Sequence, residues 1–374
     1  MEKVKMVQLK DVCEFINGDR GVNYPKADEL VDEGIPFINA GHIQNGSISF
    51  EDMNYITQEK YDKLSSGKVN KGDIVYCLRG SLGKHATITF DTGAVASSLV
   101  IMRPRTIILS DYLAYVLDST SINTQMIKAN NGSSQPNLSA TSVKEFVVPL
   151  PSLKMQEKII SIMDKAKSLV TMRRQQIQGC DELIKSQFIE MFGDPITNSK
   201  ELPRVPLGEI CNMKAGKSIK AADIFECYDD EMFPCYGGNG LRGYVKEYTH
   251  EGNIPLIGRQ GALCGNVQFA QGKFYATEHA IVTQPKVELN TCWLFIMLRE
   301  MNLNRLASGA AQPGLNVSTL VPLEVIKPPI ELQHEFAQFV QQVDKLKFGM
   351  EQSLKELEAN FDSLMQRAFK GELF

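Results

Sequence analysis

The sequence predicts a duplicated fold, in which two mixed α/β (α+β) domains are joined by two long helices that pair as an antiparallel coiled coil. Three observations support this prediction. The run from Pro149 to Pro195 has apolar residues at steps of three and four positions, as in a coiled-coil seam. A second run of this kind follows Pro328. Several motifs recur at a constant offset of 177 positions, which indicates internal duplication.

These runs divide the chain into a first domain (1–150), a first long helix (151–195), a second domain (196–330) and a second long helix (331–374). Gly193 and Pro195 end the first helix and Gly371 ends the second, because glycine adopts the left-handed conformation past a helix end and proline cannot continue a helix. The expected seams are Met155, Ile159, Ile162, Ala166, Leu169, Ile177, Cys180, Ile184 and Met191 in the first helix, and Leu332, Phe336, Phe339, Val343, Leu346, Met350, Leu354, Leu357, Phe361 and Leu364 in the second.

A polar break interrupts the first seam. Arg173, with Arg174 beside it, stands where an apolar residue is expected between Leu169 and Ile177. A polar residue in a seam can fix the register of a helix pair or face a partner subunit. We therefore predict partner binding at Arg173 and Arg174, with a solvated position as the alternative.

The first domain alternates short apolar runs with glycine-rich loops. We expect an amphipathic opening at 7–12, buried strands at 35–38, 73–78 and 94–102, and a helix at 110–128 capped by Ser110. The second domain repeats this order at 205–210, 233–236 and 252–261, the last matching 72–80. Gln312, Pro328 and Gln333 correspond to Gln135, Pro151 and Gln156.

Composition and motifs exclude several functions. The eight cysteines form no C-x-x-C pair, which disfavours zinc and redox sites and indicates reduced thiols in a cytoplasmic protein. No apolar run approaches the roughly twenty residues that span a membrane. Residues 213–218 end like a phosphate-binding loop, but Cys211 replaces the required glycine. No Asn/Asp-Pro-Pro-Tyr/Phe motif for holding a flipped base is present. The five histidines show no metal-ligand spacing, and His279 beside Glu278 is interpreted as a packed or solvated pair. No serine lies in a G-x-S-x-G motif, so we predict neither a catalytic residue nor a metal ligand.

Matched basic loops are the strongest functional signal. Arg79, Lys84 and His85 follow one predicted strand, and Arg259 and Gln260 follow its counterpart. Arginine and glutamine suit base edges, whereas lysine suits phosphates. A purely structural role for any one arginine is the alternative, and the net charge of −4 does not by itself indicate a DNA-binding protein. The candidate DNA-binding residues are Arg20, Asn23, Arg79, Ser81, Lys84, His85, Asn239, Arg242, Arg259 and Gln260.

These features resemble the specificity subunits of type I restriction-modification enzymes. The likeness rests on the two Gln-containing motifs that open the long helices (149–157 and 327–335), on the junction at 192–195, on the tail at 368–373, and on the recognition-domain sequence at 236–240 followed by Gly243 and Tyr244. The first domain departs from this last sequence at 39–42.

The resemblance implies a non-catalytic subunit whose two recognition domains each read one half of a split sequence in double-stranded DNA. It further implies that the paired helices act as a spacer and dock two methyltransferase subunits, which restriction subunits can join. S-adenosylmethionine, ATP and Mg²⁺ would then bind to those partners, and this chain would hold no cofactor.

Two other classes of function stay open at this point. A duplicated protein-interaction scaffold without DNA binding fits the slightly acidic composition, whereas the matched basic loops oppose it. A nuclease or methyltransferase that acts alone is a more distant alternative.

Overall fold

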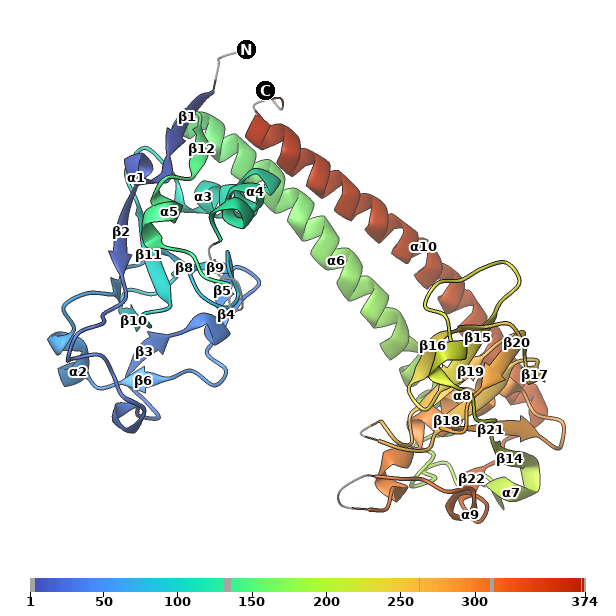
Figure 1. The fold of residues 1–374 in the computed structure, drawn as a ribbon. Helices are drawn as coiled ribbons and strands as arrows, with labels where there is room; N and C mark the ends of the chain where they lie inside the picture. The colour runs from blue at the N-terminus through green and yellow to red at the C-terminus, as the bar shows by residue number, and fades with distance from the viewer. Residues whose placement is uncertain (1–3, 131–135, 262, 310–312, 371, 373–374) are drawn as a thin grey trace. The chain divides into compact units, whose positions relative to one another are not determined.

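The computed structural model describes residues 4–130, 136–261, 263–309, 313–370 and 372. The chain forms two compact units, one comprising residues 1–173 and 353–374 and the other residues 174–352. Each unit contains a mixed α/β domain and a part of both long helices (Figure 1). The predicted fold class is therefore confirmed, and the division between the units falls within the two long helices.

The first unit contains two four-stranded sheets with the orders β2-β11-β8-β9 and β6-β3-β10-β7, together with the two-stranded sheets β1-β12 and β4-β5. The sheet that contains β11 is antiparallel, whereas β10 runs parallel to β3. The strands are β1 (Lys5–Gln8), β2 (Cys13–Asn17), β3 (Ile35–Ile38), β4 (Ile43–Gln44), β5 (Ser47–Ile48), β6 (Tyr55–Ile56), β7 (Lys68–Val69), β8 (Ile74–Cys77), β9 (His85–Thr87), β10 (Gly93–Val95), β11 (Leu99–Pro104) and β12 (Val147–Leu150).

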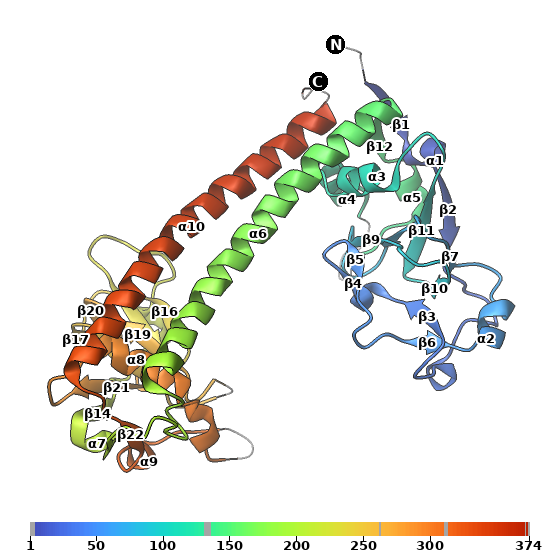
Figure 2. The ribbon, with the colours of Figure 1, turned by 180° about the vertical axis from the view of Figure 1, so that it is seen from behind.

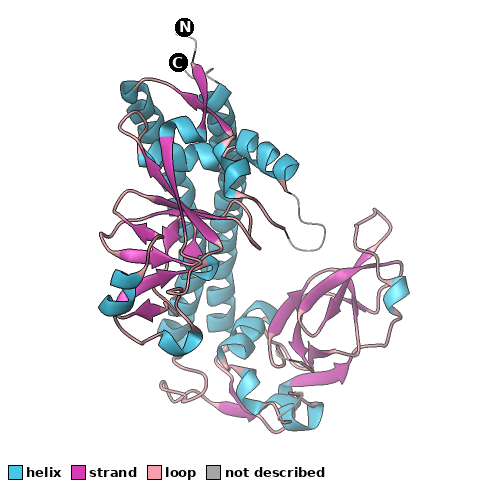
Figure 3. Ribbon diagram, turned by 60° about the vertical axis from the view of Figure 1, so that its left-hand side comes forward, coloured by secondary structure: helices cyan, strands magenta, loops and turns pink. Residues whose placement is uncertain are grey.

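Short helices complete this unit, as the view coloured by secondary structure shows (Figure 3). They are α1 (Leu9–Val12), α2 (Gln58–Lys63), α3 (Ser110–Leu117), α4 (Thr120–Ala129) and α5 (Ala140–Lys144), with 3₁₀ turns at Ala27–Glu29 and Ala40–His42.

The structure corrects three local predictions. The strand expected at 94–102 is two strands in different sheets, because the chain turns where the Leu99 N–H donates to the Ala96 carbonyl. The helix expected at 110–128 is divided into α3 and α4, and the side chain of Ser119 caps α4. Ser110 does not cap α3; its hydroxyl donates instead to the Gly72 carbonyl at 2.7 Å.

The second unit repeats this topology. Its sheets have the orders β14-β21-β18-β19, β16-β15-β20-β17 and β13-β22, and β15 runs parallel to β20 as β3 does to β10. The elements are β13 (Arg204–Pro206), α7 (Leu207–Ile210), β14 (Cys211–Ala215), β15 (Phe233–Gly237), β16 (Gly240–Val245), β17 (His250–Glu251), β18 (Ile254–Gly258), β19 (Val267–Ala270), β20 (Lys273–Ala276), β21 (Ala280–Pro285), α8 (Thr291–Glu300), α9 (Val317–Leu320) and β22 (Glu324–Ile326), with 3₁₀ turns at Ala221–Asp223 and Leu303–Leu306.

The long helices are α6 (Leu153–Phe192) and α10 (Ile330–Lys370), which Figure 2 shows from behind. In the first unit, Ile159 near the start of α6 shares a core with Phe369 near the end of α10. In the second unit, Phe192 at the end of α6 packs against Phe336 near the start of α10, with ring centroids 5.6 Å apart. The helices are thus antiparallel within each unit. As predicted, α6 stops before Gly193, whose φ is +74°; Gly371 lies outside the described residues.

The seam of these helices is only partly as predicted. Each helix is well buried where it packs against a domain, and the buried set includes Met163 and Phe188, which the predicted seam omits. Leu169 and Leu346, expected in the seam, are 49% and 61% exposed. Contacts with the two domains therefore decide which residues are buried, in addition to the pairing of the helices.

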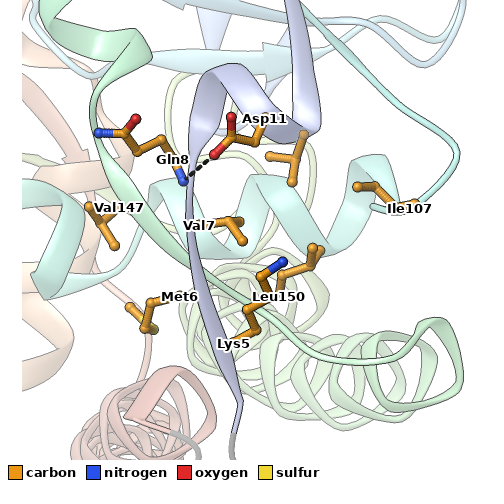
Figure 4. Close-up of a pocket in the computed structure, with 9 residues that line it drawn as sticks. Lys5, Met6, Val7, Gln8, Asp11, Ile107, Val147 and Leu150 are labelled. Carbon is orange, nitrogen blue, oxygen red and sulfur yellow. Dashed lines mark hydrogen bonds between the residues drawn. The ribbon is translucent and has the colours of Figure 1, made fainter.

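A cavity of about 480 Å³ lies beside the β1-β12 ladder of the first unit (Figure 4). It is lined by residues of β1, α1 and β12 and by Ile107, and the N–H of Gln8 donates to Asp11 Oδ2 at 3.1 Å beside it. This cavity adjoins the beginning of β2. It therefore lies at the opposite end of that strand from the loop that carries Arg20.

Candidate nucleic-acid interface

One edge of the antiparallel sheet in the first domain brings together three loops. The start of β11 lies next to the ends of two neighbouring strands, since Leu99 pairs with Cys77 of β8 and accepts a hydrogen bond from the N–H of Gly18, which follows β2. The loops after β2 and β8 and the turn before β11 therefore meet at one place. They carry the candidate residues Arg20, Asn23, Arg79, Ser81 and Lys84, and His85 begins the next strand, β9.

The loop after β2 is organised by a buried carboxylate. Asp19 accepts hydrogen bonds from the N–H of Gly21 at 2.7 Å and the N–H of Ser65 at 2.8 Å, and these backbone donors hold the pKa of Asp19 below its usual value. Arg20, which follows, is exposed and donates to the Ser97 carbonyl at 3.2 Å. Asn23 is half-buried and donates to the Lys63 carbonyl at 2.9 Å, which ties its amide to the domain.

The loop after β8 is fixed by backbone hydrogen bonds to a distant segment. The N–H of Gly80 donates to the Pro136 carbonyl at 3.2 Å, and the N–H of Leu138 donates to the Leu78 carbonyl at 2.8 Å. Arg79 and Ser81 are exposed on this fixed loop. The loop therefore presents a guanidinium group on a rigid backbone.

Two other candidates in this loop are turned toward the domain. Lys84 is half-buried, and its ammonium group donates to the Ala40 carbonyl at 3.2 Å. His85 is only 7% exposed, with Nδ1 2.9 Å from the Gly83 carbonyl and Nε2 3.2 Å from the Ala114 carbonyl. Because β9 places the ring in the core, DNA binding by His85 has no support from this geometry and stays a prediction.

The second domain builds the same edge with the same backbone hydrogen bonds. Gly258 at the end of β18 pairs with Ala280 at the start of β21, and the Ala280 carbonyl accepts from the N–H of Gly216, which follows β14. The N–H of Gly261 donates to the Pro313 carbonyl at 3.0 Å, and the N–H of Leu315 donates to the Arg259 carbonyl at 2.8 Å. These bonds correspond to those of Gly80 and Leu138 in the first domain.

This correspondence defines which side chains are equivalent. Arg79 forms a backbone bridge with Asn137, and Gln260 forms the matching bridge with Gly314. The structural counterpart of Arg79 is therefore Gln260, whereas Arg259 takes the place of the buried Leu78. In the same way, the N–H of Leu78 donates to the Ser98 carbonyl and the N–H of Arg259 donates to the His279 carbonyl, so that Ser98 and His279 are equivalent.

Arg259 is half-buried, and its Nη1 donates to the Glu278 carbonyl at 3.1 Å. The equivalent carbonyl in the first domain, that of Ser97, accepts from Arg20. One guanidinium thus braces the turn before the central strand in each domain, although it comes from a different loop. The hydrogen bond to this carbonyl uses one part of each guanidinium group, and the other N–H donors can bind another ligand.

The hairpin of β15 and β16 adds two further candidates. Asn239 and Arg242 are exposed. Gly238 lies so close to the neighbouring loop that a Cβ there would be 2.8 Å from the His279 carbonyl oxygen, so only glycine brings this turn so near the edge. Asn239 therefore lies on a turn that packs directly against the segment containing His279, whereas Arg242 lies within β16.

The structure adds a polar network that sequence analysis did not place at the site. His279 Nδ1 lies 3.1 Å from Gln260 Oε1, and His279 Nε2 lies 3.5 Å from Glu278 Oε1. The side chains of Glu278 and His279 are 37% and 42% exposed, so this network is accessible from solvent. The available signal was their place immediately before β21, on the segment equivalent to residues 97 and 98.

The remaining sequence predictions concern the helix α6 and the two loop glutamines. On α6, Arg173 is half-buried and Arg174 is exposed, and partner binding by them stays a prediction. The loop glutamines Gln135 and Gln312 lie outside the described residues.

No group of three or more potential ligands from His, Cys, Asp and Glu is placed to hold a metal ion in the part of the chain that the structure describes. Burial raises the pKa of Cys13 and of Cys211 to about 12, which makes these thiols poor nucleophiles. Within the same residues, no helix combines the length and apolarity that crossing a bilayer requires.

Comparison with known proteins identifies a family with this architecture. Residues 1–179 and 200–359 match the type I restriction modification DNA specificity domain. The chain is 42% identical over 215 residues to the type I restriction enzyme EcoprrI specificity subunit of Escherichia coli, covering 54% of this chain and 53% of the relative. It is 22% identical to the MjaIX specificity subunit of Methanocaldococcus jannaschii, over 98% of this chain and 92% of the relative.

A putative specificity subunit from Haemophilus influenzae is 29% identical over 154 residues, which are 40% of this chain. The matched segments span only 53% of the Escherichia coli relative and 39% of the Haemophilus influenzae relative. Among solved structures, the S subunit of a type I restriction-modification system from M. genitalium has a TM-score of 0.59 at 17% identity, covering 99% of this chain and 97% of that one. A chain from a study of the assembly of the type I R-M system has a TM-score of 0.66 at 18% identity, with full coverage of both chains. The duplicated family match extends over most of the sequence, and the chain therefore belongs to the family of type I restriction-modification DNA specificity domains.

Proposed function

We propose that this chain is the sequence-specific DNA-binding subunit of a type I restriction-modification complex and reads a bipartite target, one half-site per domain. One observation carries the proposal: the two domains present the same sheet edge, fixed by equivalent backbone hydrogen bonds, with different exposed side chains on it. The first edge presents Arg79 and the second presents Gln260. A common frame with different donors and acceptors suits the reading of two different base sequences.

In this proposal, the exposed candidate residues contact DNA and the braced ones position the loops. Arg79, Asn239, Arg242 and Gln260 are exposed and can reach base edges or phosphates. The half-buried Lys84 and the bracing guanidiniums of Arg20 and Arg259 have fewer free donors, and they suit the positioning of the loops.

We also propose that two methyltransferase subunits dock on the long helices, that restriction subunits can join them, and that the complex acts in the cytoplasm. Exposed apolar side chains on the helices support a docking role, since Leu346 and Phe348 of α10 are 61% and 63% exposed. S-adenosylmethionine, ATP and Mg²⁺ belong to the partner subunits in this proposal. The present chain contributes target choice and no catalytic group.

The decisive experiment combines the purified chain with its modification subunits and maps the methylated adenines on a DNA library. We expect one split sequence, methylated only when this chain is present, and tight binding of that sequence in a gel-shift assay. Methylation of unrelated sequences, or a complex that forms without any sequence preference in binding, would contradict the proposal and favour an interaction scaffold.

A further inference from the structure

The contact between Gln260 and His279 determines which atoms the glutamine side chain can offer to DNA. Gln260 is exposed at the sheet edge of the second domain, and its Oε1 lies 3.1 Å from His279 Nδ1. For an oxygen to accept at that distance, Nδ1 must carry the proton. The amide NH₂ group of Gln260 then remains for a ligand.

The surroundings of His279 are polar on two sides. Its carbonyl accepts from the N–H of Arg259 at 2.9 Å, which fixes the backbone, and its Nε2 faces Glu278 Oε1 at 3.5 Å. Ser218 Oγ lies 3.5 Å from the same carboxylate oxygen, so the loop after β14 adjoins the network as well. The backbone of His279 is thus fixed by the loop that carries Gln260, and the loop after β14 adjoins the carboxylate beside the ring.

The first domain provides a comparison within the same chain. Its equivalents of Gln260 and His279 are Arg79 and Ser98. Arginine is donor-only and needs no orienting partner to define its polarity, whereas a carboxamide can present either its oxygen or its nitrogen. The ring nitrogen of His279 therefore occurs only in the domain whose edge residue, Gln260, could present either a donor or an acceptor.

We propose that His279 is a positioning residue for specificity: by holding the carboxamide oxygen of Gln260, it makes Gln260 a donor that selects guanine in the second half-site. Guanine presents two acceptors, O6 and N7, in the major groove, whereas adenine presents N7 beside its own N6 donor. With its oxygen free, the same glutamine would prefer adenine. This inference rests on the proposed function, because it assumes that the edge faces DNA.

The test uses the complete chain assembled with its modification subunits. Once the target is mapped, dissociation constants are measured on duplexes in which each base pair of the second half-site is replaced in turn. Gln260→Ala and His279→Ala are each expected to lose about 5- to 100-fold of discrimination at the same guanine position. The double variant is expected to lose no more than Gln260→Ala alone, because the two side chains act as one unit.

Two variants separate positioning from a general structural effect. The side-chain N–H of asparagine can replace Nδ1–H, so His279→Asn is expected to retain most of the discrimination. Ser98→Ala changes the equivalent residue of the first domain and is expected to leave the second half-site profile unchanged. Thermal melting of each variant identifies any loss that comes from unfolding.

Several outcomes would overturn the inference. One is a double variant whose loss of discrimination equals the sum of the losses of Gln260→Ala and His279→Ala. Another is that the two single variants lose discrimination at different base pairs. A third is that the base at the shared position is adenine. If His279→Ala keeps full discrimination while Gln260→Ala loses it, only the positioning role of His279 is wrong. If Gln260→Ala and Arg79→Ala both retain full discrimination, these edges do not read DNA, and the proposed function loses its main support.

Discussion

Gln156 Oε1 accepts a hydrogen bond from the main-chain N–H of Leu109 at 2.8 Å, and Gln333 Oε1 accepts the matching bond from Asn290 at 3.0 Å. Both glutamines are almost fully buried near the start of a long helix. The amide nitrogen of Gln156 also donates to the Pro151 carbonyl, and that of Gln333 donates to the Pro328 carbonyl. The repeated motif thus locks each long helix to the domain that precedes it.

Replacing either glutamine is expected to destabilise its own unit. Gln156→Ala or Gln333→Ala leaves buried backbone groups without partners, which costs about 2–3 kcal/mol of unfolding free energy. Urea denaturation measures the change. Gln341→Ala, at an exposed position of α10, is the matched control and should change stability by less than about 0.5 kcal/mol. Equal effects of Gln341→Ala and Gln333→Ala would contradict the locking role.

Arg79 is expected to contribute to base reading in the first half-site. Arg79→Ala should reduce discrimination there by about 1–3 kcal/mol, because a guanidinium contact to a base edge is lost, and should leave the second half-site unchanged. Binding measured on single-substituted duplexes tests this. Equal weakening on specific and random DNA, with a smaller salt dependence, would assign Arg79 to a phosphate instead.

The exposed apolar surface of α10 is expected to bind a modification subunit. Phe348→Asp places a charge at a position that is 63% exposed, so the melting temperature should stay nearly unchanged while co-purification with the modification subunit weakens. Lys345→Ala, at an exposed neighbouring position, is the control. Undiminished co-purification of Phe348→Asp would remove this position from the docking surface.

Helix length is expected to set the number of unread base pairs between the half-sites. A helix of forty residues is about 60 Å long, and removing four residues shortens it by about 6 Å. Deleting 175–178 from α6, with a four-residue deletion in the facing part of α10 to keep the pairing, should shorten the preferred spacer by one or two base pairs at about 3.4 Å each. Methylation mapping gives the spacer directly, and an unchanged value would refute this relationship.

Acidification is expected to weaken the loop that carries Arg20. The pKa of Asp19 is lowered in the folded state, mainly by the hydrogen bond from the N–H of Gly21. Its stabilising effect is therefore complete above its unfolded pKa of about 3.9 and is lost as the pH falls through the lower folded value. Asp19→Asn should reduce stability by about 1–3 kcal/mol at pH 7, and this difference should shrink in acid. Asp91→Asn, at an exposed site, is the control, and a difference independent of pH would contradict the assignment.

The duplication, the two long helices and the loops that carry the candidate residues are all evident from the amino-acid sequence. Apolar periodicity and glycine or proline boundaries are local signals, and a repeat offset needs no coordinates. Local signals did not reveal the turn at Ala96 that separates β10 from β11, because an apolar run interrupted only by Ser97 and Ser98 is compatible with one strand or two.

The set of side chains that share the candidate interface depends on long-range packing. Hydrogen bonds between residues far apart in the chain made Gln260, and not Arg259, the counterpart of Arg79. The same long-range packing placed His85 in the core and brought His279 to the edge. Neighbouring strands of a sheet define such positions jointly, and residue spacing along one strand contains no information about the strand beside it.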